Sequence, residues 1–273
     1  MDTNNSAKKE DYTPPADIYP KINIPLIQNP SKFYAIPILG FLVKIFAIIP
    51  VAIVILFLSL FFIIVTLINS FYVLFTGKYW PFAYNYNLGL IKLNTKVYFY
   101  FTGLTDKYPG FDFKINDNYS VEMPMPENPS RFFAIPVIGG LVRAILLIPY
   151  AIYAYVLQSA AGIAYFISFV PVLFMGKYLE STYELIRDYN RVNVASSAYM
   201  MGLSDKYPSF WISMNHKTAK IILIILGIIL MIMNFSSSFT SSKKQANYNY
   251  QQDVFQQLQQ ENLLPEELPE GTE

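Results

Sequence analysis

Two long stretches without a charged side chain constrain the fold of this chain more than any other feature. Residues 45–77 and 144–176 contain no Asp, Glu, Lys or Arg. Each stretch is longer than the roughly 20 apolar residues that an α-helix needs to cross the hydrocarbon core of a bilayer. The whole chain is 53% hydrophobic and only 14% charged, which is unusual for a soluble domain. We therefore expect an integral membrane protein that is mainly α-helical.

These stretches belong to a sequence repeat with a constant offset of 99 residues. The 22 residues that begin at Asn29 share 12 identities with the 22 that begin at Asn128. A constant offset through several motifs indicates a duplicated structural unit. We predict two tandem repeats, at residues 17–116 and 117–215. The same offset, without a gap, pairs two further motifs: FTGKY (Phe75–Tyr79) with FMGKY (Phe174–Tyr178), and GLTDKYP (Gly103–Pro109) with GLSDKYP (Gly202–Pro208).

Each repeat is expected to begin with a helix at the membrane interface, followed by a spanning helix. In the first repeat Pro50 divides the apolar run, since proline is best tolerated at a helix start or at a kink. Residues 32–48 carry Lys44 in their middle, and a lysine at the bilayer centre costs about 2.5–3.5 kcal/mol on insertion scales. We therefore place residues 32–48 at the interface and residues 50–75 across the membrane. Pro149 divides the second repeat in the same way.

A second helix is predicted in each repeat, at residues 83–104 and 182–203. Both segments start polar and finish apolar, and both are long enough to cross a membrane. Their charged side chains would then need partners or a wet surface, so these helices either cross the membrane or lie at its interface. We favour a return crossing, which makes each repeat a helical hairpin.

Short segments of alternating polarity flank the repeats and predict half-buried β-strands. They are Ile22–Ile24 and Phe111–Ile115 around the first repeat, and Val121–Met123 and Phe210–Met214 around the second. We expect these strands to form a small sheet at the membrane surface, on the side where the repeats begin and end.

The two ends of the chain differ from the repeats in composition. Residues 1–16 are polar and contain proline, and residues 237–273 are rich in Ser and Gln and then acidic. Such segments bury too little apolar surface to offset the entropy of ordering, which favours flexible, disordered tails. Residues 216–236 contain the apolar stretch 219–235, which predicts one further, C-terminal transmembrane helix. With five crossings, the lysines at the ends of the repeats put the N-terminus in the cytoplasm and the C-terminal tail outside.

Composition excludes several kinds of chemistry. The chain has no cysteine and a single histidine, His216. Thiolate sites, multi-histidine metal centres and a Ser–His pair within the membrane are therefore not available. The formal net charge is +1, which argues against a nucleic-acid partner. We assign no residue to catalysis, to a cofactor or to a metal, and we do not expect an enzyme.

The Gly-Lys-Tyr turns between the two helices of each repeat are candidates for contacts with lipid headgroups. A lysine near an anionic membrane surface gains about 1 kcal/mol, and tyrosine is enriched at the interface. The alternative is a turn that only marks the membrane boundary. The candidate headgroup contacts are Lys78, Tyr79, Lys177, Tyr178, Lys92, Lys96 and Arg191.

A polar face within residues 182–203 is a second candidate site. Glu184, Arg187 and Asp188 lie three and four residues apart and therefore share one side of a helix. In a transporter such a face lines a polar cavity; otherwise its charges neutralise one another through salt bridges. The positions 99 residues earlier do not repeat these charges, so the sequence does not indicate a symmetric ion pathway.

The segments Thr105–Pro109 and Ser204–Pro208 are expected to have a structural role. Each places a hydroxyl and a carboxylate where a helix ends. Such side chains accept hydrogen bonds from nearby backbone N–H groups and fix the direction of the chain.

The first repeat resembles a family of bacterial membrane proteins, domain of unknown function 4389, through three motifs: LVKIFAIIP (Leu42–Pro50), LFTGKY (Leu74–Tyr79) and LTDKYP (Leu104–Pro109). The second repeat resembles it through LVRAILLIP, LFMGKY and LSDKYP, so the similarity covers residues 18–214 in two tandem copies. The family usually has a proline directly after the tyrosine of the turn, whereas Trp80 and Leu179 follow it here. The resemblance implies a domain of the bacterial inner (plasma) membrane and no established activity.

These features favour a multi-pass membrane protein that acts as a non-enzymatic scaffold or accessory protein. We expect it to contact membrane lipids and to dock a protein partner through its C-terminal tail. The alternative is a small transporter or channel with a polar cavity between the two repeats.

Overall fold

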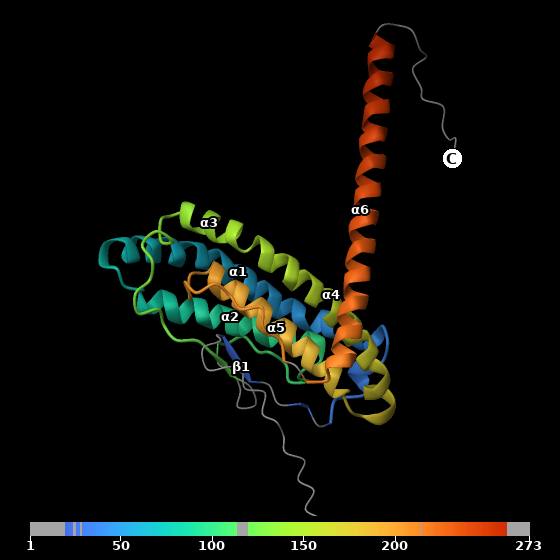
Figure 1. Ribbon diagram of the computed structural model, residues 1–273, viewed down its shortest axis with the longest axis horizontal. Coiled ribbons are helices and arrows are strands. Elements are labelled where there is room, and N and C mark those ends of the chain that lie inside the picture. The colour runs from blue at the N-terminus through green and yellow to red at the C-terminus, as the bar shows by residue number, and fades with distance from the viewer. Residues whose placement is uncertain (1–19, 24–25, 28, 114–119, 214, 261–273) are drawn as a thin grey trace, which may run out of the picture. The chain divides into compact units, whose positions relative to one another are not determined.

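The chain is mainly α-helical, which confirms the predicted class. The computed structural model describes residues 20–23, 26–27, 29–113, 120–213 and 215–260 (Figure 1). The predicted tail at residues 1–16 lies outside this part of the chain. The chain forms two compact units, Met1–Gly227 and Ile228–Glu273. The elements in chain order are β1 (Lys21–Asn23), the 3-10 helix η1 (Phe33–Ala35), α1 (Leu39–Thr76), α2 (Pro81–Thr102), β2 (Ser120–Glu122), α3 (Ile138–Leu146), α4 (Ile148–Met175), α5 (Glu180–Met200) and α6 (Lys217–Gln260).

α1 is a single helix, so the predicted division of the first apolar run at Pro50 is wrong. Pro50 is exposed, and its ring therefore displaces no packed neighbour, although the helix loses one hydrogen bond there. The helix predicted over residues 32–48 also starts late, at Leu39. Pro37 restricts the preceding residue, Ile36, to an extended backbone, as observed, and this delays the helix.

In the second half the apolar run is divided, as predicted, into α3 and α4. The break lies at Leu147, directly before α4. Pro149 is the second residue of α4, a position where a missing backbone N–H costs no helical hydrogen bond. The two halves therefore differ at their prolines, and nothing in the structure explains why only the second helix breaks.

Three helices among the described residues, α1, α4 and α6, are long and apolar enough to cross a membrane. α2 and α5 form at the positions predicted for the second helix of each repeat, but they are not in this group. α6 contains the predicted span at residues 219–235 and continues to Gln260. Residues 237–260, which we predicted as part of a flexible tail, are therefore helical. Gln and Lys recur in this segment, and both are good helix formers.

α2 and α5 form the centre of the Met1–Gly227 unit. α2 packs against α1 and α5, and α5 packs against α4. In Figure 1, α1, α3 and α4 lie on one side of α2 and α5, and β1 lies on the other side. α2 and α5 are buried along most of their length. α1, in contrast, buries only a narrow stripe and leaves most of its apolar surface exposed.

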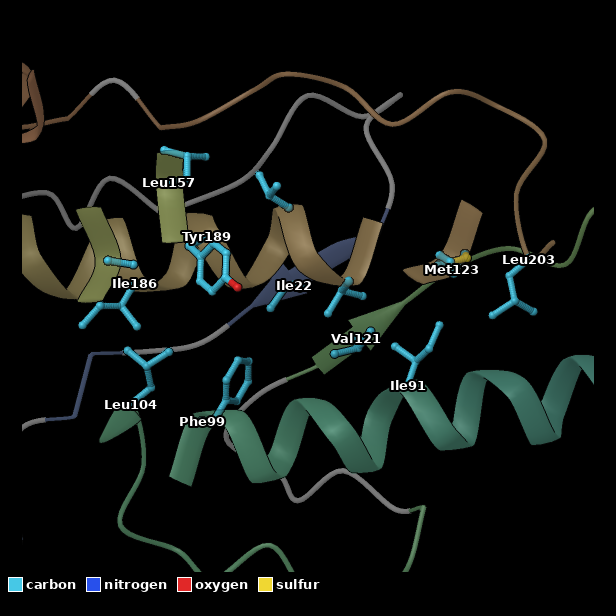
Figure 2. Packing of buried hydrophobic residues seen from close by; sticks show 14 of the residues in the cluster. Ile22, Ile91, Phe99, Leu104, Val121, Met123, Leu157, Ile186, Tyr189 and Leu203 are labelled. Atoms are coloured by element: carbon cyan, nitrogen blue, oxygen red, sulfur yellow. The ribbon is translucent and has the colours of Figure 1, made fainter. Parts of the chain in front are cut away.

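β1 and β2 pair antiparallel and connect the beginnings of the two halves, with Ile22 opposite Val121. Both side chains belong to the hydrophobic core. Figure 2 shows them among side chains of α2 and α5, including Ile91, Phe99 and Ile186. The ribbon thus covers α2 and α5 and excludes water from between them.

The segments predicted as closing strands of the two repeats are not strands where the structure describes them. Residues 111–113 and 210–213 have no regular structure, and the remaining residues of these predictions lie outside the described chain. Lys96 of α2 and Arg191 of α5 each bind a main-chain carbonyl in these segments. These carbonyls are therefore hydrogen-bonded to side chains and are not free to pair with a neighbouring strand.

Candidate functional site

An ion pair between Arg143 of α3 and Asp205, which follows α5, connects three motifs of the second half. Asp205 Oδ1 accepts a hydrogen bond from Arg143 Nη2, and Asp205 Oδ2 accepts one from the backbone N–H of Ser130 at 2.6 Å. Arg143 Nη1 donates to the carbonyls of Tyr199 and Ser204 at 2.7 and 2.9 Å. The Asn-Pro-Ser motif, the helical arginine and the Ser-Asp-Lys-Tyr-Pro motif therefore form one buried site.

The first half has a related arrangement at positions 99 residues earlier, with Lys44 in place of the arginine. Asp106 Oδ2 accepts a hydrogen bond from the backbone N–H of Ser31 at 2.6 Å. Lys44 Nζ lies 5.1 Å from the ring centroid of Tyr34 and 5.7 Å from that of Tyr100. A cation over an aromatic ring gains about 0.5–2 kcal/mol. Each half therefore buries one cation between its first helix and the end of its second.

The predicted structural role of the two Asp-Lys-Tyr-Pro segments agrees with these contacts. Thr105 Oγ1 accepts a hydrogen bond from the backbone N–H of Lys107, and Ser204 Oγ accepts one from that of Lys206, both at 3.2 Å. Hydroxyl and carboxylate together hold the chain in place where each helix ends.

Two of the predicted headgroup contacts, Lys96 and Arg191, are buried and bound within the protein. Lys96 Nζ donates to the carbonyl of Asp112 at 2.6 Å and to its carboxylate at 2.9 Å. Arg191 donates to the carbonyl of Trp211, and its guanidinium lies 5.0 Å from the centroid of the indole. Positions 112 and 211 are 99 residues apart, so the two halves use equivalent carbonyls. The sequence did not predict that Lys96 and Arg191 bind these carbonyls, because every residue has a main-chain carbonyl whatever its type.

Lys78 and Lys177, the lysines of the two Gly-Lys-Tyr turns, are exposed, and Lys92 is partly exposed. The tyrosines of the turns face inward instead. Tyr79 is buried; its hydroxyl donates to the carbonyl of Met201 at 3.4 Å. Burial raises the pKa of Tyr79 to about 12, so the phenol remains a hydrogen-bond donor at neutral pH. Tyr178 is partly buried against the core.

Glu184 and Asp188, on the polar face of α5, bind Lys220 at the start of α6. Lys220 Nζ lies 2.9 Å from Glu184 Oε2 and 3.2 Å from Asp188 Oδ2, and it donates to the carbonyl of Ser213 at 3.1 Å. Arg187 Nε lies 4.0 Å from Asp188 Oδ1. This polar face therefore holds the first turn of α6. Sequence reasoning missed Lys220 as the partner of this face, although it lies inside the last apolar stretch.

The pKa of the Glu184 carboxyl is lowered by this cluster. Burial on its own raises the pKa of Glu184. The hydrogen bond and charge of Lys220, with smaller contributions from Asn215 and Arg187, together outweigh this effect, so the net shift is downward. Glu184 therefore stays ionised at neutral pH. His216 Nδ1 lies 3.5 Å from Glu184 Oε2 on the exposed side of the cluster.

A cavity of about 510 Å³ lies between α1, α2 and α5. Its lining is uncharged and mostly apolar, and the charged face of α5 does not contribute to it. α2 and α5 line it with residues at offsets of 99, a relationship that the sequence analysis did not foresee. These are Ile91, Asn94, Thr95 and Tyr98 from α2, and Asn190, Asn193, Val194 and Ser197 from α5.

One polar group in the cavity wall has no partner within the part of the chain that the structure describes. The Nδ2 group of Asn190 is buried and makes no hydrogen bond there. An unpaired buried N–H costs about 1–3 kcal/mol. The cavity is therefore suited to an uncharged, mostly apolar group that carries a hydrogen-bond acceptor. Among the described residues, no three His, Asp or Glu side chains gather closely enough to hold a metal ion.

Comparison with protein families gives a match within the second half of the chain. Residues 139–212 match the model of a family described as "Domain of unknown function (DUF4389)". The match contains α4, α5 and the Arg143–Asp205 site, and it supports the family for the second half of the chain. No curated protein and no solved structure matches.

Proposed function

We propose that this chain is a non-enzymatic membrane protein that acts as a scaffold or accessory protein in the bacterial inner membrane. The observation that carries the proposal is the internal pairing of four buried cations. Arg143, Lys96, Arg191 and Lys220 are each bound to acceptors within the Met1–Gly227 unit. Charged groups that stabilise a fold in this way are not available to a substrate.

We further propose that the two halves are tandem copies of one unit. Equivalent glycines at the helix ends support this: Gly77 and Gly176 have φ of 70° and 66°, and Gly103 and Gly202 have φ of 77° and 74°. Glycine adopts this left-handed conformation without a steric cost, so it terminates helices readily. The hydrogen bonds from Ser31 to Asp106 and from Ser130 to Asp205 are likewise offset by 99 residues.

Lipid contact is assigned to the turns that follow α1 and α4. Lys78 and Lys177 are exposed there, and a lysine near an anionic surface gains about 1 kcal/mol. The buried Lys96 and Arg191 take no part in this contact.

A protein partner is assigned to the C-terminal region. The part of α6 after its apolar stretch is polar, and Tyr248 and Tyr250 are exposed on it. Exposed tyrosines are common anchors at protein interfaces. We therefore place the docking segment within residues 250–273, which begin at Tyr250.

A transporter is the weaker alternative. It would need Glu184 and Asp188 to face a path, whereas both are bound to Lys220. Transport by the purified protein in proteoliposomes that is lost in Glu184→Gln and Asp188→Asn would overturn the scaffold proposal.

The direct test of the scaffold is purification of the full chain and of a variant ending at residue 249, from native membranes, in mild detergent. We expect both forms in the membrane fraction, and one stoichiometric protein partner only with the full chain. Recovery of the full chain as a soluble, monodisperse protein without detergent would contradict the membrane assignment. A partner that is kept by the shortened variant would contradict the docking segment.

A further inference from the structure

Exposed apolar surface in the Met1–Gly227 unit is concentrated on α1, α3 and α4. Large side chains such as Phe57, Ile145 and Phe174 are exposed along these helices. Figure 1 shows the three helices on the same side of α2 and α5. Exposed aromatic residues also occur in the segments after α2 and α5, but as small groups near charged residues, as at Tyr108, Phe111 and Asp112. Apolar side chains exposed along whole helices mark a site of contact with a partner or a membrane.

The opposite side consists of non-helical chain that runs back beside α2. After α2 ends at Thr102, the chain returns so that Asp112 binds Lys96 and Phe113 lies against Gly89. The 13 residues from Thr102 back to Gly89 correspond to about 20 Å of helix, at about 1.5 Å per residue. Irregular backbone thus accompanies α2 over most of the thickness of a hydrocarbon core, about 30 Å.

The second half has the same construction. The chain after α5 runs back so that Trp211 meets Arg191, and the backbone N–H of Ser213 donates to Asp188 at 3.0 Å. These non-helical segments therefore lie alongside both central helices, and their position relative to the helices is fixed by buried hydrogen bonds.

This construction conflicts with two hairpins that cross the bilayer. If α1 and α2 crossed together, the segment after α2 would lie at the depth of the lipid chains. Lipid-exposed non-helical backbone does not occur there, since each unpaired N–H or C=O costs several kcal/mol. The Asp112 carboxylate, on a side chain that is 67% exposed, would also face lipid, which is costly for a charge.

Dimensions favour a helix layer that lies flat. A helix is about 10 Å thick with its side chains, and one leaflet contributes half of a hydrocarbon core of about 30 Å. α1, with 38 residues, is about 57 Å long at about 1.5 Å per residue. Its exposed apolar surface therefore exceeds what a perpendicular crossing can bury.

We infer that α1, α3 and α4 lie in the plane of the membrane, embedded in one leaflet, with α2 and α5 above them and the extended segments in water. This rests on the proposed membrane function and specifies its partner as the acyl-chain region of a single leaflet. The turns at Lys78 and Lys177 and the segments at Lys107 and Lys206 then all lie on one side of the bilayer. If the hairpins crossed the bilayer, the turns at Lys78 and Lys177 would lie on the opposite side of the membrane from the segments at Lys107 and Lys206.

Single cysteines test this directly, because the chain has none of its own. Lys78→Cys, Lys177→Cys, Lys107→Cys and Lys206→Cys replace exposed lysines. With a membrane-impermeant maleimide, we expect all four to react in vesicles of one orientation and none in the other. Lys244→Cys, beyond the apolar part of α6, is the control expected to react from the opposite face. Reaction of the two turns from the face opposite to the two segments would overturn the inference.

A depth measurement gives an independent result. Leu42, Phe57 and Phe71 are exposed near the start, middle and end of α1. Nitroxide labels on single cysteines at these positions are expected to lie at equal depth, within one leaflet. A deep label at position 57 with shallow labels at 42 and 71 would show a crossing helix and contradict the proposal. Absence of the protein from the membrane fraction would instead contradict the membrane function itself, so the two failures are distinguishable.

Discussion

Arg143 of α3 and Asp205 form a partly buried ion pair that ties the first helix of the second half to the segment after its last helix. Removing one partner of such a pair leaves an uncompensated buried charge. Asp205 is partly exposed, so solvent reduces the penalty. We expect Asp205→Asn to lower the free energy of unfolding by about 2–3 kcal/mol. Thermal unfolding in detergent, followed by the fluorescence of Trp80 and Trp211, measures it.

The matched control is Asp106→Asn in the first half. Asp106 accepts the same backbone hydrogen bond, and Lys44 is held by aromatic rings. We expect a loss of about 1 kcal/mol, the size of one weakened hydrogen bond. Equal losses in the two variants would contradict the view that the ion pair adds stability in the second half.

Gly139 is expected to tolerate no larger residue. A Cβ atom at this position would overlap the carbonyl oxygen of Phe133, whereas one at the neighbouring Gly140 would meet no atom within 4 Å. Gly139→Ala should lower stability by about 3 kcal/mol, the upper range for overpacking. Gly140→Ala should raise the stability by about 0.5–1 kcal/mol. Alanine allows the unfolded chain fewer backbone conformations than glycine, so less conformational entropy is lost on folding. Chemical denaturation of both variants tests the pair, and a harmless Gly139→Ala would contradict the packing described for α3.

The contact between Glu184 and Lys220 should make stability depend on acid. The folded state lowers the pKa of Glu184, so the contact stabilises the fold above the ordinary carboxyl pKa of 4.5. That stability is lost as the pH falls through the lower folded pKa. We expect Glu184→Gln to be less stable than the parent at pH 7, with a difference in melting temperature that shrinks as the pH falls below the ordinary carboxyl pKa. The control is Glu180→Gln, because the Glu180 side chain is 66% exposed. A constant difference across the pH range would show that the Glu184 charge has no role.

Asn190 is expected to destabilise the protein when no ligand occupies the adjoining cavity. Its buried N–H group lacks a partner among the described residues, and replacing it with an apolar side chain removes that cost. We expect Asn190→Leu to raise stability in detergent by about 1 kcal/mol. The cavity of about 510 Å³ leaves room for the side chain. A loss of stability in lipid nanodiscs, with a gain in detergent, would show that a lipid acceptor binds this amide.

The sequence predicted the helical elements well where local patterns decide them. The charge-free runs, the glycines at helix ends and the repeated motifs placed α2, α4 and α5 close to their observed bounds. Pro50 misled the prediction because a proline can stand inside a helix at the loss of one backbone hydrogen bond, and α1 continues through it. The closing strands failed because side chains of α2 and α5 bind the backbone of those segments.

The candidate sites were less accessible from sequence. The polar face of Glu184 and Asp188 was recognised, but its partner Lys220 lies over 30 residues away and only the fold brings them together. Lys96 and Arg191 were expected at lipid headgroups because they are charged, yet both bind main-chain carbonyls. A carbonyl is present at every residue, so no motif reveals which one a buried cation will bind.

The pairing of β1 with β2 has a consequence for assembly. Ile22 of β1 pairs with Val121 of β2. During synthesis, the edge of β1 therefore stays unpaired until the ribosome has made β2, at the start of the second half. An exposed edge recruits whatever strand is nearby. Two separately expressed halves should therefore associate through β1 and β2. Two copies of the same half carry equivalent strands, so they could pair with each other and form a homodimer instead.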